Sequence, residues 1–80
     1  MTAGVPAGAV TLVYSGECDN YTELRAGLRR LGHAFRTDSD TEVVLRGYLE
    51  WGDGVAGRLN GMFAFAIWDM RSERLLLGRD

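Results

Sequence analysis

Apolar positions divide the chain into segments with helical spacing and segments that are apolar without interruption. Residues 9–14 are rich in β-branched and aromatic side chains and end at Ser15 and Gly16, a pair typical of turns. We therefore expect a strand over residues 9–14. The preceding residues are small and include Pro6, and they predict a flexible lead-in over residues 1–8.

Residues 20–32 have the signals of a helix. Asn20 suits the N-cap position, and Glu23 follows three residues later, so the two are expected to form a capping box. Gly32 suits the left-handed position that ends a helix. One apolar stripe is formed by Leu24, Leu28 and Leu31. A short extended stretch is expected over residues 33–36.

A second helix is expected to begin at Ser39 and to end at Gly52. Ser39 and Glu42 match a capping box, and Asp40 would place a negative charge at the positive end of the helix dipole. The apolar positions Val44, Tyr48 and Trp51 have helical spacing. A weaker helical segment is predicted over residues 55–59.

The last part of the chain predicts two strands joined by a polar turn. Residues 62–68 and 75–77 are apolar at every position, a pattern typical of strands covered on both faces. The expected order is β-α-β-α-α-β-β, which defines an α+β fold. Since these helices are too few to cover both faces of a sheet, we expect one layer of the fold to be missing from this chain.

Composition narrows the possible partners. The chain has 80 residues, enough for one small domain, and a formal net charge of -2. Nucleic acid and anionic membranes are not expected as partners because either would require a basic patch. No apolar run is long enough to span a bilayer, and no signal peptide is apparent. The single cysteine, Cys18, permits no internal disulfide, and we expect a cytoplasmic protein.

Motifs for metals and nucleotides are not found. The sequence contains no CxxC, no HExxH and no paired histidines, so no metal site is predicted. Residues 52–57 contain glycines but lack the lysine and hydroxyl of a phosphate-binding loop. No cofactor is therefore expected within this chain.

Four blocks of sequence, in order, resemble one family. Residues 14–25, YSGECDNYTELR, are similar to the NGEIYNYxELR segment of class II glutamine amidotransferase domains. Residues 31–43, LGHAFRTDSDTEV, resemble LGHxFxTxSDTEV, and residues 59–69 have the sequence LNGMFAFAIWD. Residues 77–80, LGRD, look like the start of ARDRxGxKPLY. The resemblance covers about residues 9–80 and is strongest to glutamine-hydrolysing asparagine synthetases.

The resemblance implies an N-terminal-nucleophile hydrolase, in which two stacked sheets lie between helix layers. Residues 9–80 would form part of this four-layer αββα domain. An N-terminal cysteine attacks the side-chain amide of glutamine, with its own α-amino group as the base. The ammonia is passed to a synthetase domain, where ATP and Mg activate aspartate. We expect that domain, and the nucleophile, to lie outside this chain, which begins with Met1.

Three residues match functional positions of the family. Gly16 corresponds to a glycine whose N–H contributes to the oxyanion hole. Glu17 corresponds to a glutamate that contacts glutamine, and Asp40 to the aspartate that binds its α-ammonium group. Asp40 is equally compatible with a plain acid in the first turn of a helix. Ser15 occupies the position of an oxyanion-binding asparagine, and its hydroxyl can also donate.

Other positions depart from the family pattern and leave several functions open. Cys18 and Asp19 replace an apolar residue and a tyrosine, and Cys18 has no neighbouring base that would make it a nucleophile. The first hypothesis is a glutaminase-domain fragment, inactive alone, whose partners are glutamine and the remainder of its parent enzyme. The second is a non-catalytic unit that forms homo-oligomers through apolar strands. The third is a module that binds glutamine without hydrolysing it.

Overall fold

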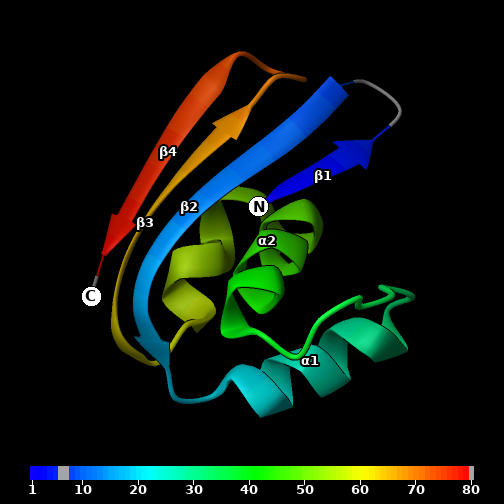
Figure 1. Ribbon diagram of the computed structural model, residues 1–80, viewed down its shortest axis with the longest axis vertical. Helices are drawn as coiled ribbons and strands as arrows, with labels where there is room; N and C mark the ends of the chain where they lie inside the picture. Colours follow the sequence, from blue (N-terminus) through cyan, green and yellow to red (C-terminus); the bar gives the residue numbers. More distant parts are fainter. Residues whose placement is uncertain (6–7, 80) are drawn as a thin grey trace.

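The computed structural model, which describes residues 1–5 and 8–79, is built on a four-stranded antiparallel sheet (Figure 1). The strands lie in the order β1 (Thr2–Val5), β2 (Gly8–Cys18), β3 (Gly61–Asp69) and β4 (Arg74–Arg79). Between β2 and β3 the chain forms α1 (Tyr21–Arg30), α2 (Asp40–Trp51) and the 3-10 helix η1 (Gly52–Arg58). The α+β class expected from the sequence is confirmed.

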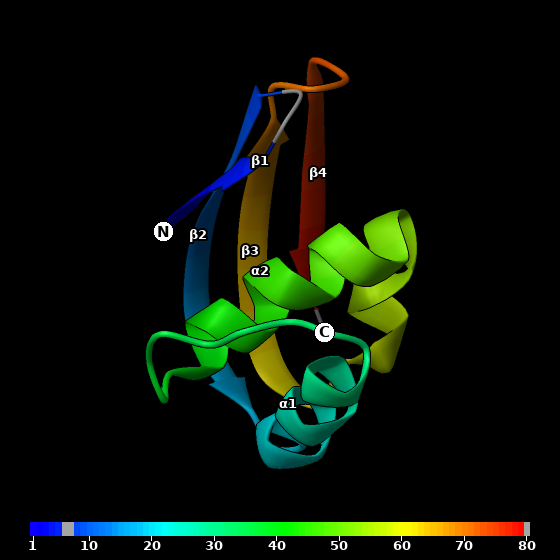
Figure 2. The ribbon, with the colours of Figure 1, turned by 90° about the vertical axis from the view of Figure 1, so that its right-hand side faces the viewer.

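The helices cover one face of the sheet (Figure 2). Side chains alternate between the faces of a strand, and the buried face of β2 and β3 carries Val10, Leu12, Phe63, Phe65 and Ile67. These residues form one core with three residues of α2, Val44, Leu45 and Tyr48, and with Val55 of η1. The core therefore fixes α2 against the two central strands.

The opposite face of the sheet is apolar and exposed within the described chain. The strand register places Ala66 between Val13 and Leu77, and Trp68 beside Leu75. Val13 and Leu77 are each 69% exposed. The uninterrupted apolar run of residues 62–68 thus has two apolar faces. The helices of this chain cover only one of them, as expected from the small number of helices.

The starts of the two helices differ from each other. The Ser39 hydroxyl accepts the Glu42 N–H at 3.4 Å, which confirms Ser39 as the N-cap of α2. Asn20 precedes α1 but its side chain does not cap the helix, so the capping box predicted with Glu23 is wrong. The Asn20 amide instead donates to the Arg58 carbonyl and accepts from the Asn60 N–H, both at 2.9 Å. It ties the end of β2 to the start of β3.

The observed order, β-β-α-α-η-β-β, differs from the expected one by an added first strand, by the absence of a strand over residues 33–36 and by a 3-10 helix in place of the last, weaker helix; β2 is also longer than expected. Residues 2–5, expected as part of a flexible lead-in, pair with residues 8–11 through backbone bonds that need no bulky side chains; residues 6–7 of that lead-in lie outside the described residues. Strand β2 continues through Ser15 and Gly16 to Cys18, because it stays paired with β3. Residues 33–36 form no strand, since no strand lies beside them.

A buried aspartate closes the far end of the sheet. Asp69, the last residue of β3, is 3% exposed. Its carboxylate accepts the Tyr48 hydroxyl at 2.6 Å and the Arg71 guanidinium at 2.8 and 2.9 Å. These bonds join α2 to the turn between β3 and β4.

Among the helices described, none is long and apolar enough to cross a membrane.

Candidate functional site

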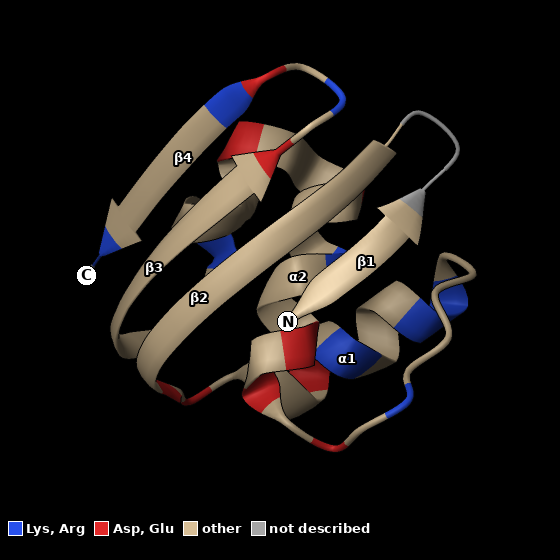
Figure 3. Ribbon diagram, turned by 45° about the horizontal axis from the view of Figure 1, so that its top comes forward, with Lys and Arg blue, Asp and Glu red and all other residues tan. Residues whose placement is uncertain are grey.

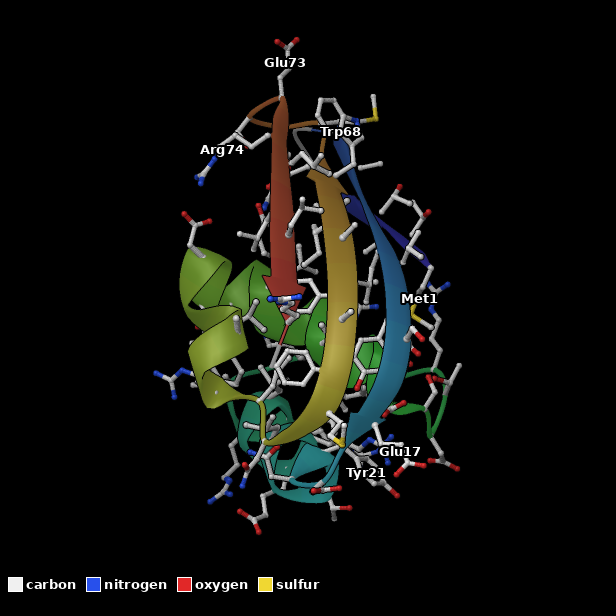
Figure 4. All side chains as sticks on the ribbon, turned by 90° about the vertical axis from the view of Figure 1, so that its left-hand side faces the viewer. Met1, Glu17, Tyr21, Trp68, Glu73 and Arg74 are labelled. Carbon is white, nitrogen blue, oxygen red and sulfur yellow. The ribbon has the colours of Figure 1, made fainter. Side chains whose placement is uncertain are left out.

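A cavity of about 560 Å³ lies where β2 ends and α2 begins. It is lined by residues 16–19, Tyr21 and residues 38–40. Glu17 and Tyr21 lie at this same end of the molecule (Figure 4). Acidic positions gather here, whereas the middle parts of β2 and β3 carry no charge (Figure 3). The cavity therefore favours a ligand with a positively charged group.

Asp40 is the first residue of α2 and lines this cavity. One carboxylate oxygen, Oδ2, accepts the Tyr14 hydroxyl at 3.3 Å and the Cys18 N–H at 3.2 Å. Of the arginines and the histidine in residues 1–5 and 8–79, none forms an ion pair with Asp40. The carboxylate is thus held by neutral donors and keeps its charge available to a ligand.

The loop before Asp40 is fixed by a second carboxylate. Glu42 is 3% exposed and accepts the N–H groups of Arg36 and Thr37, the latter at 2.8 Å, as well as the Thr37 hydroxyl. Burial alone would raise the pKa of Glu42, but the hydrogen bonds from Arg36 and Thr37 together lower it. Glu42 therefore remains charged and holds residues 36–37, which lead into the wall of the cavity.

Gly16 contributes backbone without a side chain to this cavity. Its φ of 116° lies in the region that favours glycine, and a Cβ there would collide with the Met62 carbonyl oxygen and lie 2.7 Å from the Phe63 Cα. Only glycine therefore fits while β2 stays paired with β3.

The structure brings three of the four expected site residues to one cavity. Gly16, Glu17 and Asp40 all line it, whereas Ser15 does not belong to its lining. Ser15 pairs with Ala64 and is exposed. Its parity along β2 places its side chain on the face opposite to that of Tyr14. The hydroxyl of Ser15 thus lies on the uncovered side of the sheet. Glu17 has the same parity as Ser15 and is exposed, and it borders the cavity because it lies next to the end of the strand.

Cys18 is packed rather than poised for attack. Its side chain is buried, and Sγ donates to the Asn20 Oδ1 at 3.1 Å. Burial, the largest cause, raises the pKa of the thiol above its ordinary value. Since the thiolate is the nucleophilic form, this thiol is unsuited to attack an amide. In the part of the chain that the structure describes, no group of three or more His, Cys, Asp or Glu is arranged to hold a metal ion.

Tyr14 was not predicted as a site residue. Its hydroxyl reaches Asp40 across 26 positions of sequence, a contact that local patterns do not reveal. The available signal was strand parity, because Tyr14 shares the helix-covered face of β2 with Leu12. Asp19 and Asp38 also line the cavity; Asp38 pairs with Arg25 at 3.7 Å, so of these two acids only Asp19 adds negative charge that no described ion pair balances.

Comparison with known proteins identifies the class. Residues 5–80 match the family described as glutamine amidotransferase domain. The chain belongs to this family. A solved structure of glutamine phosphoribosylpyrophosphate amidotransferase from Bacillus subtilis, complexed with ADP and GMP, superimposes with a TM-score of 0.79 at 27% identity, over 96% of this chain and 18% of the other.

Within the family, the chain is similar to asparagine synthetases. It is 47% identical over 70 residues to glutamine-hydrolyzing asparagine synthetase 3 of Bacillus subtilis, which covers 88% of this chain and 11% of that protein. It is 39% identical over 72 residues to glutamine-hydrolyzing asparagine synthetase 2 of Oryza sativa subsp. japonica, covering 90% of this chain and 12% of the relative. The chain therefore spans about a ninth of the length of these relatives.

Proposed function

We propose that this chain forms the glutamine-binding side of the glutaminase site of an asparagine synthetase-like enzyme. The observation that carries the proposal is the cavity in which Gly16, Glu17 and the unneutralised Asp40 meet. Glutamine carries an α-ammonium group, which suits a carboxylate, and an amide whose carbonyl becomes an oxyanion during hydrolysis. The backbone N–H of Gly16 would stabilise that oxyanion without reorganising, while Glu17 would contact the substrate.

Hydrolysis also requires a nucleophile, which we propose comes from outside these 80 residues. Cys18 is buried and hydrogen-bonded, so the chain alone is expected to be inactive. In the complete enzyme, the ammonia would serve amidation of aspartate in a synthetase domain that binds ATP and Mg. The matched relatives are named as asparagine synthetases, and we further propose a cytoplasmic location and a place in asparagine biosynthesis.

A chimera tests this function. Residues 9–80 would replace the matching segment of asparagine synthetase 3 of Bacillus subtilis, and asparagine formation would be measured with glutamine and with ammonia. The expected result is activity with both nitrogen sources. In the chimera, Asp40→Asn should reduce the glutamine reaction at least about tenfold and spare the ammonia reaction, as expected for loss of a charge-assisted contact.

The matched control in the chimera is Asp53→Asn. Asp53 is exposed and pairs with Arg74, away from the cavity, so both reactions should persist. A chimera that uses ammonia but not glutamine would contradict the proposed function. Equal loss of both reactions in Asp40→Asn would show that Asp40 supports the fold rather than the substrate.

A second candidate function is self-association, which is favoured by the exposed apolar face of the sheet around Val13, Trp68 and Leu77. Such a face requires a cover, which either another copy or the remainder of the parent domain would supply. Size-exclusion chromatography with light scattering distinguishes these. A folded dimer that becomes monomeric in Leu77→Arg would support self-association, and a folded monomer would exclude it.

A further inference from the structure

We propose that Tyr14 is a positioning residue, whose hydroxyl holds the Asp40 carboxylate in the orientation that binds the ammonium group of glutamine. The proposal rests on the proposed function and assigns a task to a residue outside the matched glutamine-binding positions. Tyr14 lies on β2 and Asp40 at the start of α2. Their hydrogen bond of 3.3 Å joins β2 to the start of α2, where Asp40 lines the cavity.

The two donors to Asp40 share one of its carboxylate oxygens. The Tyr14 hydroxyl and the Cys18 N–H both bind Oδ2 of Asp40. Within the described residues no hydrogen bond is made to Oδ1 of Asp40. Two donors from different directions fix the place of Oδ2 and leave the other oxygen for a ligand. With the Cys18 N–H alone, the side chain could rotate about that single bond.

Tyr14 holds Asp40 with a donor that carries no charge. An arginine at this position would orient Asp40 equally well but would cancel its charge, as Arg71 does for Asp69. A tyrosine hydroxyl supplies a hydrogen bond and no charge. Burial and then the charge of Asp40 raise the pKa of Tyr14, so the hydroxyl stays protonated and continues to donate at neutral pH.

The Tyr14 ring is held in place by the hydrophobic core. The Tyr14 side chain packs against the hydrophobic core that joins β2, β3 and α2. Its ring is therefore fixed by residues that do not touch the cavity. Because the ring is fixed relative to the core, its hydrogen bond also fixes the Asp40 carboxylate relative to the core. Supporting residues keep binding groups in place in this way.

The test compares Tyr14→Phe with Tyr48→Phe in the 80-residue chain. Both changes remove a hydroxyl bound to an aspartate, but only the first affects the cavity. Amide hydrogen exchange measured by NMR reports the Cys18 N–H, which is bound to Asp40. In Tyr14→Phe we expect this amide to exchange about fivefold faster relative to the core amide of Leu12, the factor for one hydrogen bond of ordinary strength. Tyr48→Phe should leave this ratio unchanged.

Ligand titrations supply the second readout. Tyr14→Phe should weaken glutamine binding about fivefold and should leave binding of glutaramate, which lacks the ammonium group, unchanged. An unchanged Cys18 exchange ratio would overturn the proposal, and so would equal weakening for both ligands. Failure of the unaltered chain to bind glutamine would count against the proposed function, while the exchange ratio would still decide whether Tyr14 fixes Asp40.

Discussion

Asp40 and Asp69 each accept a hydrogen bond from a tyrosine hydroxyl, but only Asp69 also pairs with an arginine. At Asp69 the Tyr48 hydroxyl lies at 2.6 Å and the Arg71 guanidinium at 2.8 Å. At Asp40 the Tyr14 hydroxyl lies at 3.3 Å, and the second donor is a backbone N–H. Asp69 is buried, whereas Asp40 lines an open cavity.

The difference separates a structural carboxylate from one available to a ligand. The hydrogen bonds from Arg71 hold the pKa of Asp69 well below its usual range, and burial opposes them. Burial, followed by the bond to Asp69, raises the pKa of Tyr48. Every interaction of Asp69 is therefore internal to the fold. Asp40 has orientation without neutralisation, which a binding site for an ammonium group requires.

The largest expected effect on stability is that of Asp69→Asn. The change removes the charge that balances Arg71 and replaces an acceptor of Tyr48 with an amide. Asp69 is buried but the Arg71 side chain is 32% exposed, so solvent screens part of the pair. Hydrogen bonds to a charged group contribute about 1.5–3 kcal/mol, and we expect a loss of roughly 2–3 kcal/mol in the free energy of unfolding measured with urea. Asp40→Asn should cost less than about 1 kcal/mol, since its bonds are partly exposed. Equal losses would remove the distinction between the two aspartates.

Acid provides a related but smaller perturbation, because protonated Asp69 keeps its packing. The pKa values of Asp69 and Glu42 are lower in the folded state than in the unfolded chain. Such groups stabilise the fold above their unfolded pKa values, and that stability is lost as the pH falls. The free energy of unfolding should therefore be nearly constant from about pH 7 to 5 and decline below about pH 4. In Asp69→Asn the decline should be shallower, and an unchanged slope would contradict this assignment.

A smaller loss of stability is expected for a substitution at Gly16, beside the cavity, where the backbone conformation and not a charge limits which residue fits. Gly16→Ala places a side chain at a φ of 116° and against the Met62 carbonyl. We expect a loss of about 2 kcal/mol in the free energy of unfolding. Gly54→Ala is the matched control, because a Cβ there meets nothing within 4 Å. Similar costs at both positions would show that the close approach of β2 and β3 does not require glycine.

Local patterns predicted the elements that depend on their own side chains. The helix beginning after Ser39 and the two apolar strands near the C-terminus were expected within a few residues of their observed positions. Gly16, Glu17 and Asp40 were expected as site residues, and the structure places all three around one cavity. The motifs thus selected residues that lie together in the fold, and their roles stay predictions.

Features that depend on distant partners could not be predicted. Strand β1 is specified by its pairing with β2 rather than by its small side chains. Asn20 looked like a helix cap, but its side-chain amide binds Arg58 and Asn60, which follow it by 38 and 40 positions. Tyr14 reaches Asp40 across 26 positions. In each case the fold, rather than the neighbouring sequence, decided which residue became the partner.

The most direct test of the account is a glutamine titration of the chain and of Asp40→Asn, followed by NMR at the Gly16 amide. The account predicts a saturable shift in the unaltered chain and an affinity at least about tenfold weaker in Asp40→Asn, as expected for loss of a charge-assisted contact. The urea midpoint should stay nearly constant. Equal affinity in both proteins, or no shift at Gly16 in the unaltered chain, would contradict the assignment of Asp40 as the group that binds the ammonium of glutamine.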